Sequence, residues 1–86
     1  MADAPLRANY DDIVDVLYLS VGHAKPSSYQ EDDSGLVWRL LDDGTVFGVT
    51  VFDFVAEWQP QAEALAATVA KRLGVPREMA REALHR

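Results

Sequence analysis

The chain has 86 residues, of which 49% are hydrophobic and 26% are charged, and it contains no cysteine. This length predicts one small domain, and the lack of cysteine excludes disulfides, thiolate metal sites and cysteine nucleophiles. Because a net charge of −6 repels phosphate backbones, we expect no nucleic-acid ligand.

The N-terminal residues lack the apolar core of a signal peptide, and no apolar run is long enough to span a membrane. These features predict a cytoplasmic protein that does not bind membranes.

Segments rich in β-branched and aromatic residues predict three or four antiparallel strands. The expected strands are a short one from Leu6 to Tyr10, one from Val16 to Val21, and two hairpin arms from about Leu36 to Leu41 and from Val46 to Phe52. The polar span from His23 to Ser34 reads as an exposed loop.

Two acidic motifs predict turns. Asp43 and Gly44 supply the residues that a tight hairpin turn requires, so they are expected to fix the turn between the two arms. Asp11-Asp12-x-x-Asp15 matches the magnesium-binding string of prenyl-transferring enzymes. Here it lies between two strands, and we interpret Asp11 and Asp15 as turn-fixing residues that bond to backbone N–H groups. Gly48 indicates a bulge or a close approach by a neighbour.

After Phe54 the apolar period changes from two residues to about 3.6, which predicts helices. The first runs over residues 60–73, with Pro60 at its start and Gly74 as its stop. The second runs over residues 76–85. We therefore predict a single α+β domain over residues 1–86: an antiparallel β-meander of three to four strands (6–54), followed by one or two C-terminal helices packed on one face.

Two segments resemble a known family. The run from Tyr10 to Leu19 (YDDIVDVLYL), and Leu36-Val37 followed by the run from Asp43 to Val51 (DGTVFGVTV), are similar to the strand motifs of the small bacterial DUF2283 proteins. The resemblance covers roughly residues 8 to 54. Trp38-Arg39 departs from it, because the family has an acidic residue there. The resemblance implies a small β-meander with a helix and no established activity.

No set of polar residues predicts catalysis or a bound ion. The serines lie beside no oxyanion motif, and His23 and His85 have no third ligand in view. Seven carboxylates could gather at one end of the sheet and hold calcium or magnesium, but their spacing fits no EF-hand loop, and we interpret them as a solvated face. They are Asp11, Asp12, Glu31, Asp32, Asp33, Asp42 and Asp43. We predict no catalytic, cofactor or metal residues, and a protein that is not an enzyme.

Neither face of the predicted strands is clearly polar, so both are expected to be buried. Two short helices cover only one face, and a second subunit is expected to cover the other. The expected interface residues are Tyr18, Trp38, Val49 and Val51.

These features predict a self-associating interaction or scaffold protein, with a homodimer favoured. The alternative is an acidic, antitoxin-like neutraliser of a basic partner protein, because complementary charge guides association. A small-molecule or divalent-cation binding protein has less support.

Overall fold

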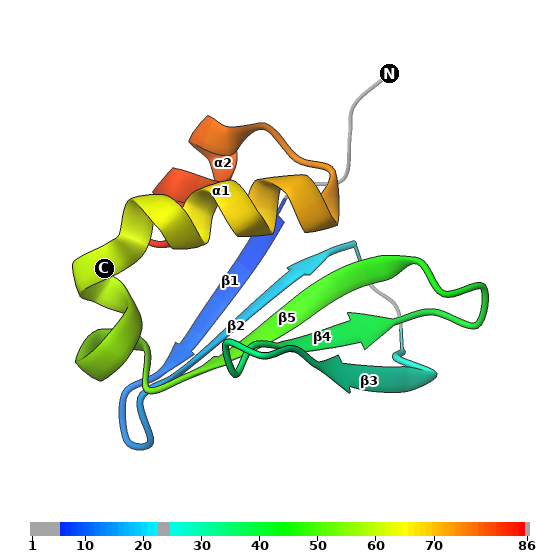
Figure 1. Cartoon of the computed structure of the whole chain (residues 1–86), viewed down its shortest axis with the longest axis horizontal. Helices are drawn as coiled ribbons and strands as arrows, with labels where there is room; N and C mark the ends of the chain where they lie inside the picture. The colour runs from blue at the N-terminus through cyan, green and yellow to red at the C-terminus, as the bar shows by residue number, and fades with distance from the viewer. Residues whose placement is uncertain (1–5, 23–24, 86) are drawn as a thin grey trace.

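The computed structural model describes residues 6–22 and 25–85, which form an α+β fold (Figure 1). A five-stranded antiparallel sheet is followed by helices, as the sequence predicts, with one strand more than expected. No helix within the described ranges is both long and apolar enough to cross a membrane.

The strand order in the sheet is β1-β2-β5-β4-β3. The strands are β1 (Leu6–Asp11), β2 (Val16–Val21), β3 (Ser28–Glu31), β4 (Val37–Leu40) and β5 (Val46–Phe52). The chain crosses from β2 to the far edge, forms β3 there, and returns through β4 to β5, which pairs with β2. The sheet is therefore not a simple meander, because β2 and β5 are neighbours in space but not in sequence.

The strand β3 lies inside the segment that the sequence suggested was a loop. All four of its residues are exposed, and it lies at an edge of the sheet, where one side of the strand has no partner. A polar edge strand carries no apolar alternation, and this removes the signal that identifies the other strands. His23 and Ala24 of the expected loop lie outside the described residues.

The hairpin between β4 and β5 turns at Asp43 and Gly44. Gly44 has φ +86° and donates its N–H to the carbonyl of Leu41 at 2.9 Å. Farther along, the register shifts between Arg39 and Leu40, where Arg39 pairs with Gly48 and Leu40 pairs with Val46. Phe47 is the extra residue of this bulge, which lies beside the glycine that suggested one.

Four helical segments follow the sheet: the π-helix η1 (Phe54–Trp58), the 3-10 turn η2 (Gln59–Gln61), and the helices α1 (Ala62–Leu73) and α2 (Arg77–Ala83). Pro60 lies in η2, two residues before the start of α1, and Gly74 ends α1 with φ +69°. Both C-terminal helices therefore form at the predicted positions, each slightly shorter than expected.

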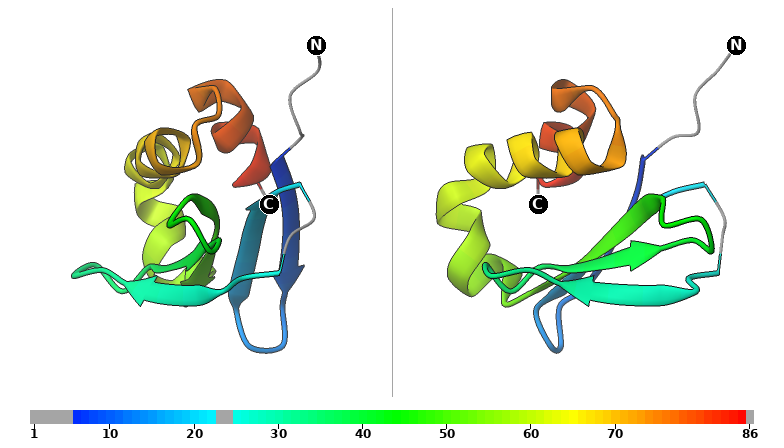
Figure 2. Two further views of the ribbon diagram at one scale, coloured as in Figure 1. Left: turned by 90° about the vertical axis from the view of Figure 1, so that its right-hand side faces the viewer. Right: turned by 45° about the vertical axis from the view of Figure 1, so that its right-hand side comes forward.

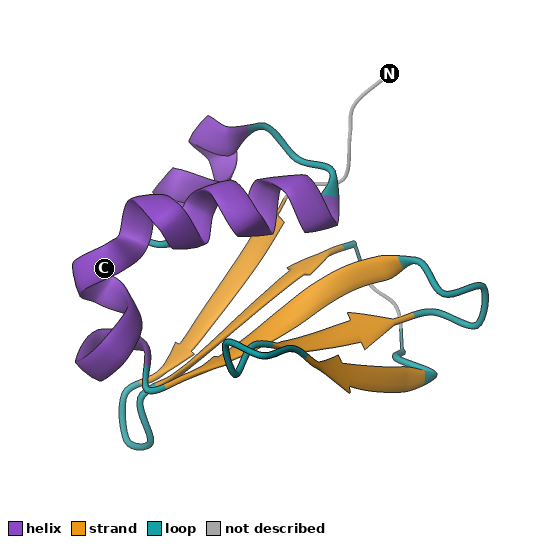
Figure 3. Cartoon of the chain, viewed as in Figure 1, coloured by secondary structure: helices purple, strands orange, loops and turns teal. Residues whose placement is uncertain are grey.

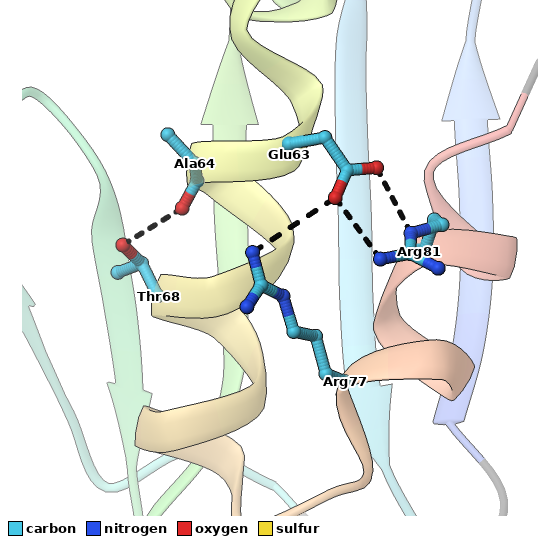
Figure 4. A network of polar contacts seen from close by, with 5 residues as sticks. All are labelled: Glu63, Ala64, Thr68, Arg77 and Arg81. Atoms are coloured by element: carbon cyan, nitrogen blue, oxygen red, sulfur yellow. Dashed lines mark hydrogen bonds and ion pairs between the residues drawn. The ribbon is translucent and has the colours of Figure 1, made fainter.

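The helices pack on one face of the sheet (Figures 2 and 3). Between them and the strands lies the core, which contains Leu17, Leu19, Trp38, Val49, Val51, Phe54, Leu65 and Val69. Glu63 of α1 binds Arg81 of α2 through two hydrogen bonds of 2.9 and 3.1 Å and lies 3.9 Å from Arg77 (Figure 4). These exposed ion pairs join α1 to α2.

Candidate functional site

Asp15 connects the first hairpin to the segment that follows the last strand. Its carboxylate accepts hydrogen bonds from the Tyr10 hydroxyl at 2.7 Å and from the backbone N–H groups of Val55 (2.8 Å) and Ala56 (3.1 Å). Its carbonyl accepts from the N–H of Phe54. Asp15 thus satisfies the first donors of η1, a role that a capping side chain usually plays from within the same segment.

This arrangement shifts the pKa of both partners. The N–H of Val55 and then the hydroxyl of Tyr10 lower the pKa of Asp15 below 3.8, and the same hydrogen bond, helped by burial, raises the pKa of Tyr10 to about 12. Because the folded state lowers the pKa of Asp15, its carboxylate stabilises the fold above pH 3.8, and this contribution is lost as pH falls through the folded-state pKa.

We therefore expect Asp15→Asn to lower the urea midpoint of unfolding at pH 7, and the difference from wild type to shrink well below pH 3.8. Asp12→Asn is the matched control, because Asp12 is exposed in the same turn. A difference that stays constant with pH would mean that the ionised carboxylate does not stabilise the fold.

The other turn carboxylates also accept hydrogen bonds. Asp11 accepts a hydrogen bond from the N–H of Ile13 at 3.0 Å, and Asp43 accepts one from the N–H of Thr45 at 2.9 Å. Asp42 accepts a hydrogen bond from the Ser27 hydroxyl. These carboxylates hold the turns that connect the strands.

The seven acidic residues do not all lie at one end of the sheet, because Asp42 and Asp43 are separated from the other five. The turn that carries Asp42 and Asp43 follows β4, while Asp11 and Asp12 lie in the turn between β1 and β2, at the opposite end of the strands (Figure 1). Within residues 6–22 and 25–85, no three His, Asp or Glu side chains are grouped so that they could hold a metal ion.

The structure corrects the predicted interface. Trp38, Val49 and Val51 are fully buried in the core beneath the helices of their own chain, where a second subunit cannot reach them. Of the four expected interface residues, only Tyr18 lies on the other face of the sheet, with 37% of its surface exposed. A candidate interface must therefore be sought on the face that carries Tyr18.

We call this face, which points away from α1 and α2, the open face. No helix within the described residues covers it (Figure 2). Side chains alternate between the faces of a strand, so the partners of the core residues lie here. The register places them in three rows. The Arg row is Arg7, Ser20, Gly48, Arg39 and Tyr29; the Tyr18 row is Asn9, Tyr18, Thr50, Val37 and Glu31; and the Phe52 row is Asp11, Val16 and Phe52.

A shallow groove of about 600 Å³ runs along the Arg row, lined by Arg7, Ala8, Asn9, Tyr18, Ser20 and Arg39. The groove lies over Ser20, whose side chain is small, while the neighbouring Gly48 is buried. A Cβ at position 48 would lie 2.8 Å from the carbonyl oxygen of Leu19 and 3.3 Å from Cδ of Arg39. The glycine therefore allows Arg39 to lie across β5, where its guanidinium is 5.5 Å from the ring centroid of Phe47.

The opposite end of the open face is apolar. Phe52 is 49% exposed and pairs with Val16, and exposed Val14 and Val55 lie beside this row on the two segments that Asp15 joins. Ile13, at the tip of the same hairpin, is 90% exposed. Four exposed apolar side chains, those of Ile13, Val14, Phe52 and Val55, therefore lie toward this end of the sheet.

The sequence does not indicate that Arg7, Arg39 and Gly48 lie in one row across the sheet. They come from β1, β4 and β5, and only the pairing of β2 with β5 brings them together. The one signal in the sequence is the unusual glycine within an apolar strand, which indicates that a neighbour approaches closely.

Comparison of the chain with protein-family models, with curated proteins and with solved structures finds no match. The resemblance to the DUF2283 family therefore stays a prediction.

Proposed function

We propose that this protein is a small self-associating interaction protein, and that it forms a homodimer through the open face of its sheet. The observation that carries the proposal is the exposure of Tyr18 and Phe52 on a sheet face that no described helix covers. Large aromatic side chains at the centre of a flat surface supply much of the binding energy in protein interfaces.

The composition of the open face supports the same proposal. Asn9 and Thr50 flank Tyr18, Val37 lies beyond Thr50, and Val16 flanks Phe52, so apolar side chains occur on three neighbouring strands of this face. Packing one sheet against another buries such a face at a separation of about 10 Å. A small domain without disulfides gains stability from this burial.

The test is the mass of the chain in solution over a range of concentrations, measured by sedimentation equilibrium. Wild type is expected to approach twice the mass of one chain. Phe52→Asp is expected to raise the dissociation constant at least about 30-fold, because it places a charge in the contact and removes an aromatic anchor.

The matched control is Ala64→Asp, which adds the same charge at an exposed position of α1. This variant should dimerise like wild type. Circular dichroism of each variant checks that the chain is folded. A wild-type chain that stays monomeric at high concentration would overturn the proposal.

The alternative is that the chain neutralises a basic partner protein. It is supported by the net charge of −6 and by the carboxylates of Asp11, Asp12 and Asp53 near the apolar end of the open face. A monomeric wild type that forms a stoichiometric complex with a basic protein from its own host, detected by native mass spectrometry, would favour this alternative.

A further inference from the structure

We infer that the groove along the Arg row is a binding site for a small phosphate monoester, whose phosphate group bonds to the arginines and hydroxyl groups that line it. This inference goes beyond self-association and does not rest on it, because every residue that lines the groove belongs to one chain. The spacing of the lining side chains and the charge of the groove both support it.

Four of the lining side chains form a compact block on the neighbouring strands β1 and β2. Arg7 pairs with Ser20. Two residues farther along β1, Asn9 pairs with Tyr18, so the two pairs lie side by side on the open face. Residues directly opposite each other are about 5 Å apart, and residues two apart on one strand are about 7 Å apart. A guanidinium, an amide and two hydroxyl groups can therefore all reach one small ligand.

Arg39 reaches the same groove from β4 because Gly48 has no side chain. The position that a Cβ of Gly48 would occupy lies 3.3 Å from Cδ of Arg39 and 3.4 Å from Cβ of Ser20. These two side chains thus approach each other over the glycine, although β5 lies between their strands. The ring centroid of Phe47 is 5.5 Å from Cζ of Arg39, and this contact holds the cation in place before a ligand binds.

The groove is positive in a chain that is acidic as a whole. The full sequence has 14 acidic and 8 basic residues, yet the described lining of the groove includes two arginines and no carboxylate. Within the described residues Arg39 makes no ion pair, whereas the arginines of α2 pair with Glu63. Glu31 lies on the open face in the neighbouring Tyr18 row, on the edge strand β3, and does not line the groove. The groove therefore favours an anionic ligand.

The donors in the groove suit a phosphate monoester better than a carboxylate. A guanidinium only donates hydrogen bonds, and its fork of N–H groups fits two oxygens of one anion while leaving donors for other acceptors. A phosphate monoester offers three terminal oxygens and a charge of about −1.5 to −2 at pH 7, whereas a carboxylate has fewer oxygens and less charge.

The size of the groove indicates that the phosphate group is part of a larger molecule. Its volume of about 600 Å³ is typical of a site for a small organic ligand and exceeds what a phosphate group alone fills. The organic part of the ester then lies against the ring of Tyr18, which is 37% exposed.

The test is a titration with phenyl phosphate at pH 7 and constant ionic strength, followed by nitrogen-15 NMR. We expect saturable shifts of the backbone signals of Arg7, Tyr18 and Ser20 and of the Nε–H signal of Arg39. Inorganic phosphate has no ring to place against Tyr18 and should bind at least about fivefold more weakly. Benzoate keeps a ring but replaces the phosphate group by a carboxylate, and it should also bind more weakly.

Substitutions of Arg39 test the anion contact. Arg39→Gln is expected to raise the dissociation constant of phenyl phosphate about tenfold or more, because it removes a charged donor. Arg39→Lys keeps the charge but not the fork, and its dissociation constant should lie between those of wild type and Arg39→Gln. Arg77→Gln, the same change on α2 outside the groove, is the matched control and should bind within about twofold of wild type.

A second substitution leaves Arg39 unchanged. Ser20→Asp places a carboxylate in the groove, where it competes with the ligand for the arginines, and should weaken binding about tenfold or more. Ala64→Asp adds the same charge at an exposed position of α1 and should not weaken binding. Circular dichroism of each variant checks that the chain is folded.

Binding is measured in wild type and in Phe52→Asp, the variant expected to be monomeric, so that a groove covered by a second subunit is not mistaken for a missing site. Binding by either chain supports the inference, and the Arg39 and Ser20 variants are compared in the chain that binds. No saturable shift at the groove in either chain, or equal binding by Arg39→Gln and its parent chain, would overturn the inference and leave self-association standing.

Two further results would overturn the choice of ligand. Equal or tighter binding of benzoate would mean that the groove does not select phosphate. Tighter binding of a phosphoserine peptide than of phenyl phosphate would assign the groove to a phosphorylated protein instead of a small molecule.

Discussion

Trp38→Ala is expected to destabilise the fold by about 3–5 kcal/mol, because it removes a fully buried aromatic side chain from the centre of the core. The indole packs beneath Arg72, whose guanidinium lies 4.5 Å from the ring centroid, and donates its N–H to Asp32 at 2.9 Å. Small domains are stable by only about 5–15 kcal/mol, so the loss is a large part of the total. Urea unfolding followed by far-UV circular dichroism measures it.

The matched control is Tyr18→Ala, measured at a concentration where the chain is monomeric. Tyr18 is partly exposed on the open face, so its truncation leaves no closed cavity, and we expect an effect below about 1.5 kcal/mol. The pair of variants tests the corrected placement of the two residues. Equal destabilisation by Trp38→Ala and Tyr18→Ala would contradict it.

Local signals predict the elements of this fold well. The hairpin at Gly44 depends on a positive φ that glycine adopts readily, and the end of α1 at Gly74 depends on the same property. The stripe of Leu65, Ala66, Val69 and Leu73 identifies α1 from the order of the residues alone. Each of these features is encoded within a few neighbouring residues.

Which of the two faces of the sheet a side chain occupies cannot be predicted in the same way. Val16 and Leu17 are both buried, as are Val49 and Thr50, so apolar character alone does not say which member of a pair faces the helices. That choice depends on the pairing of β2 with β5 and on where α1 packs, which are long-range contacts. The strand pattern therefore suggests an interface position for Trp38, although this residue lies at the centre of the core.

The carboxylates of Asp11 and Asp43 accept hydrogen bonds from N–H groups two residues farther on, which is the local contact that the sequence predicts, whereas Asp15 bonds outside its turn, to the N–H groups of Val55 and Ala56. Two bonds escape prediction because they reach beyond the two-residue spacing of a turn motif. Asp15 binds Val55, forty positions away, and Asp32 binds the indole of Trp38. Such bonds form only once the sheet has assembled.

Asp32 is expected to be the acidic residue whose removal most affects stability. Its Oδ1 accepts hydrogen bonds from the N–H and hydroxyl of Ser34 and from the N–H of Leu36, while its Oδ2 accepts the indole N–H of Trp38. Asp32→Ala leaves that buried N–H without an acceptor, which costs about 1–3 kcal/mol. Asp33→Ala, at the exposed neighbouring position, is the control and should change the urea midpoint little.

The dependence on pH follows from the same contacts. Burial opposes ionisation of Asp32, but the donors of Ser34, Trp38 and Leu36 together outweigh it and lower the pKa of this carboxyl below 3.8. The stabilisation is thus present above pH 3.8 and is lost as pH falls through the folded-state pKa, so wild type and Asp32→Ala should converge in acid.

Asp32→Asn separates the charge from the hydrogen bonds. Its amide oxygen can keep the bonds to Ser34 and Leu36, but its NH₂ group then faces the indole N–H, and two donors cannot bond to each other. We therefore expect Asp32→Asn to remain destabilised in the presence of Trp38 and to lose most of that penalty when Trp38→Phe removes the indole N–H. A double-mutant cycle measured by urea unfolding at pH 7 gives this coupling, expected at about 1 kcal/mol or more. A coupling near zero would mean that the bond between Asp32 and Trp38 does not stabilise the core, and that the carboxylate acts on the turn alone.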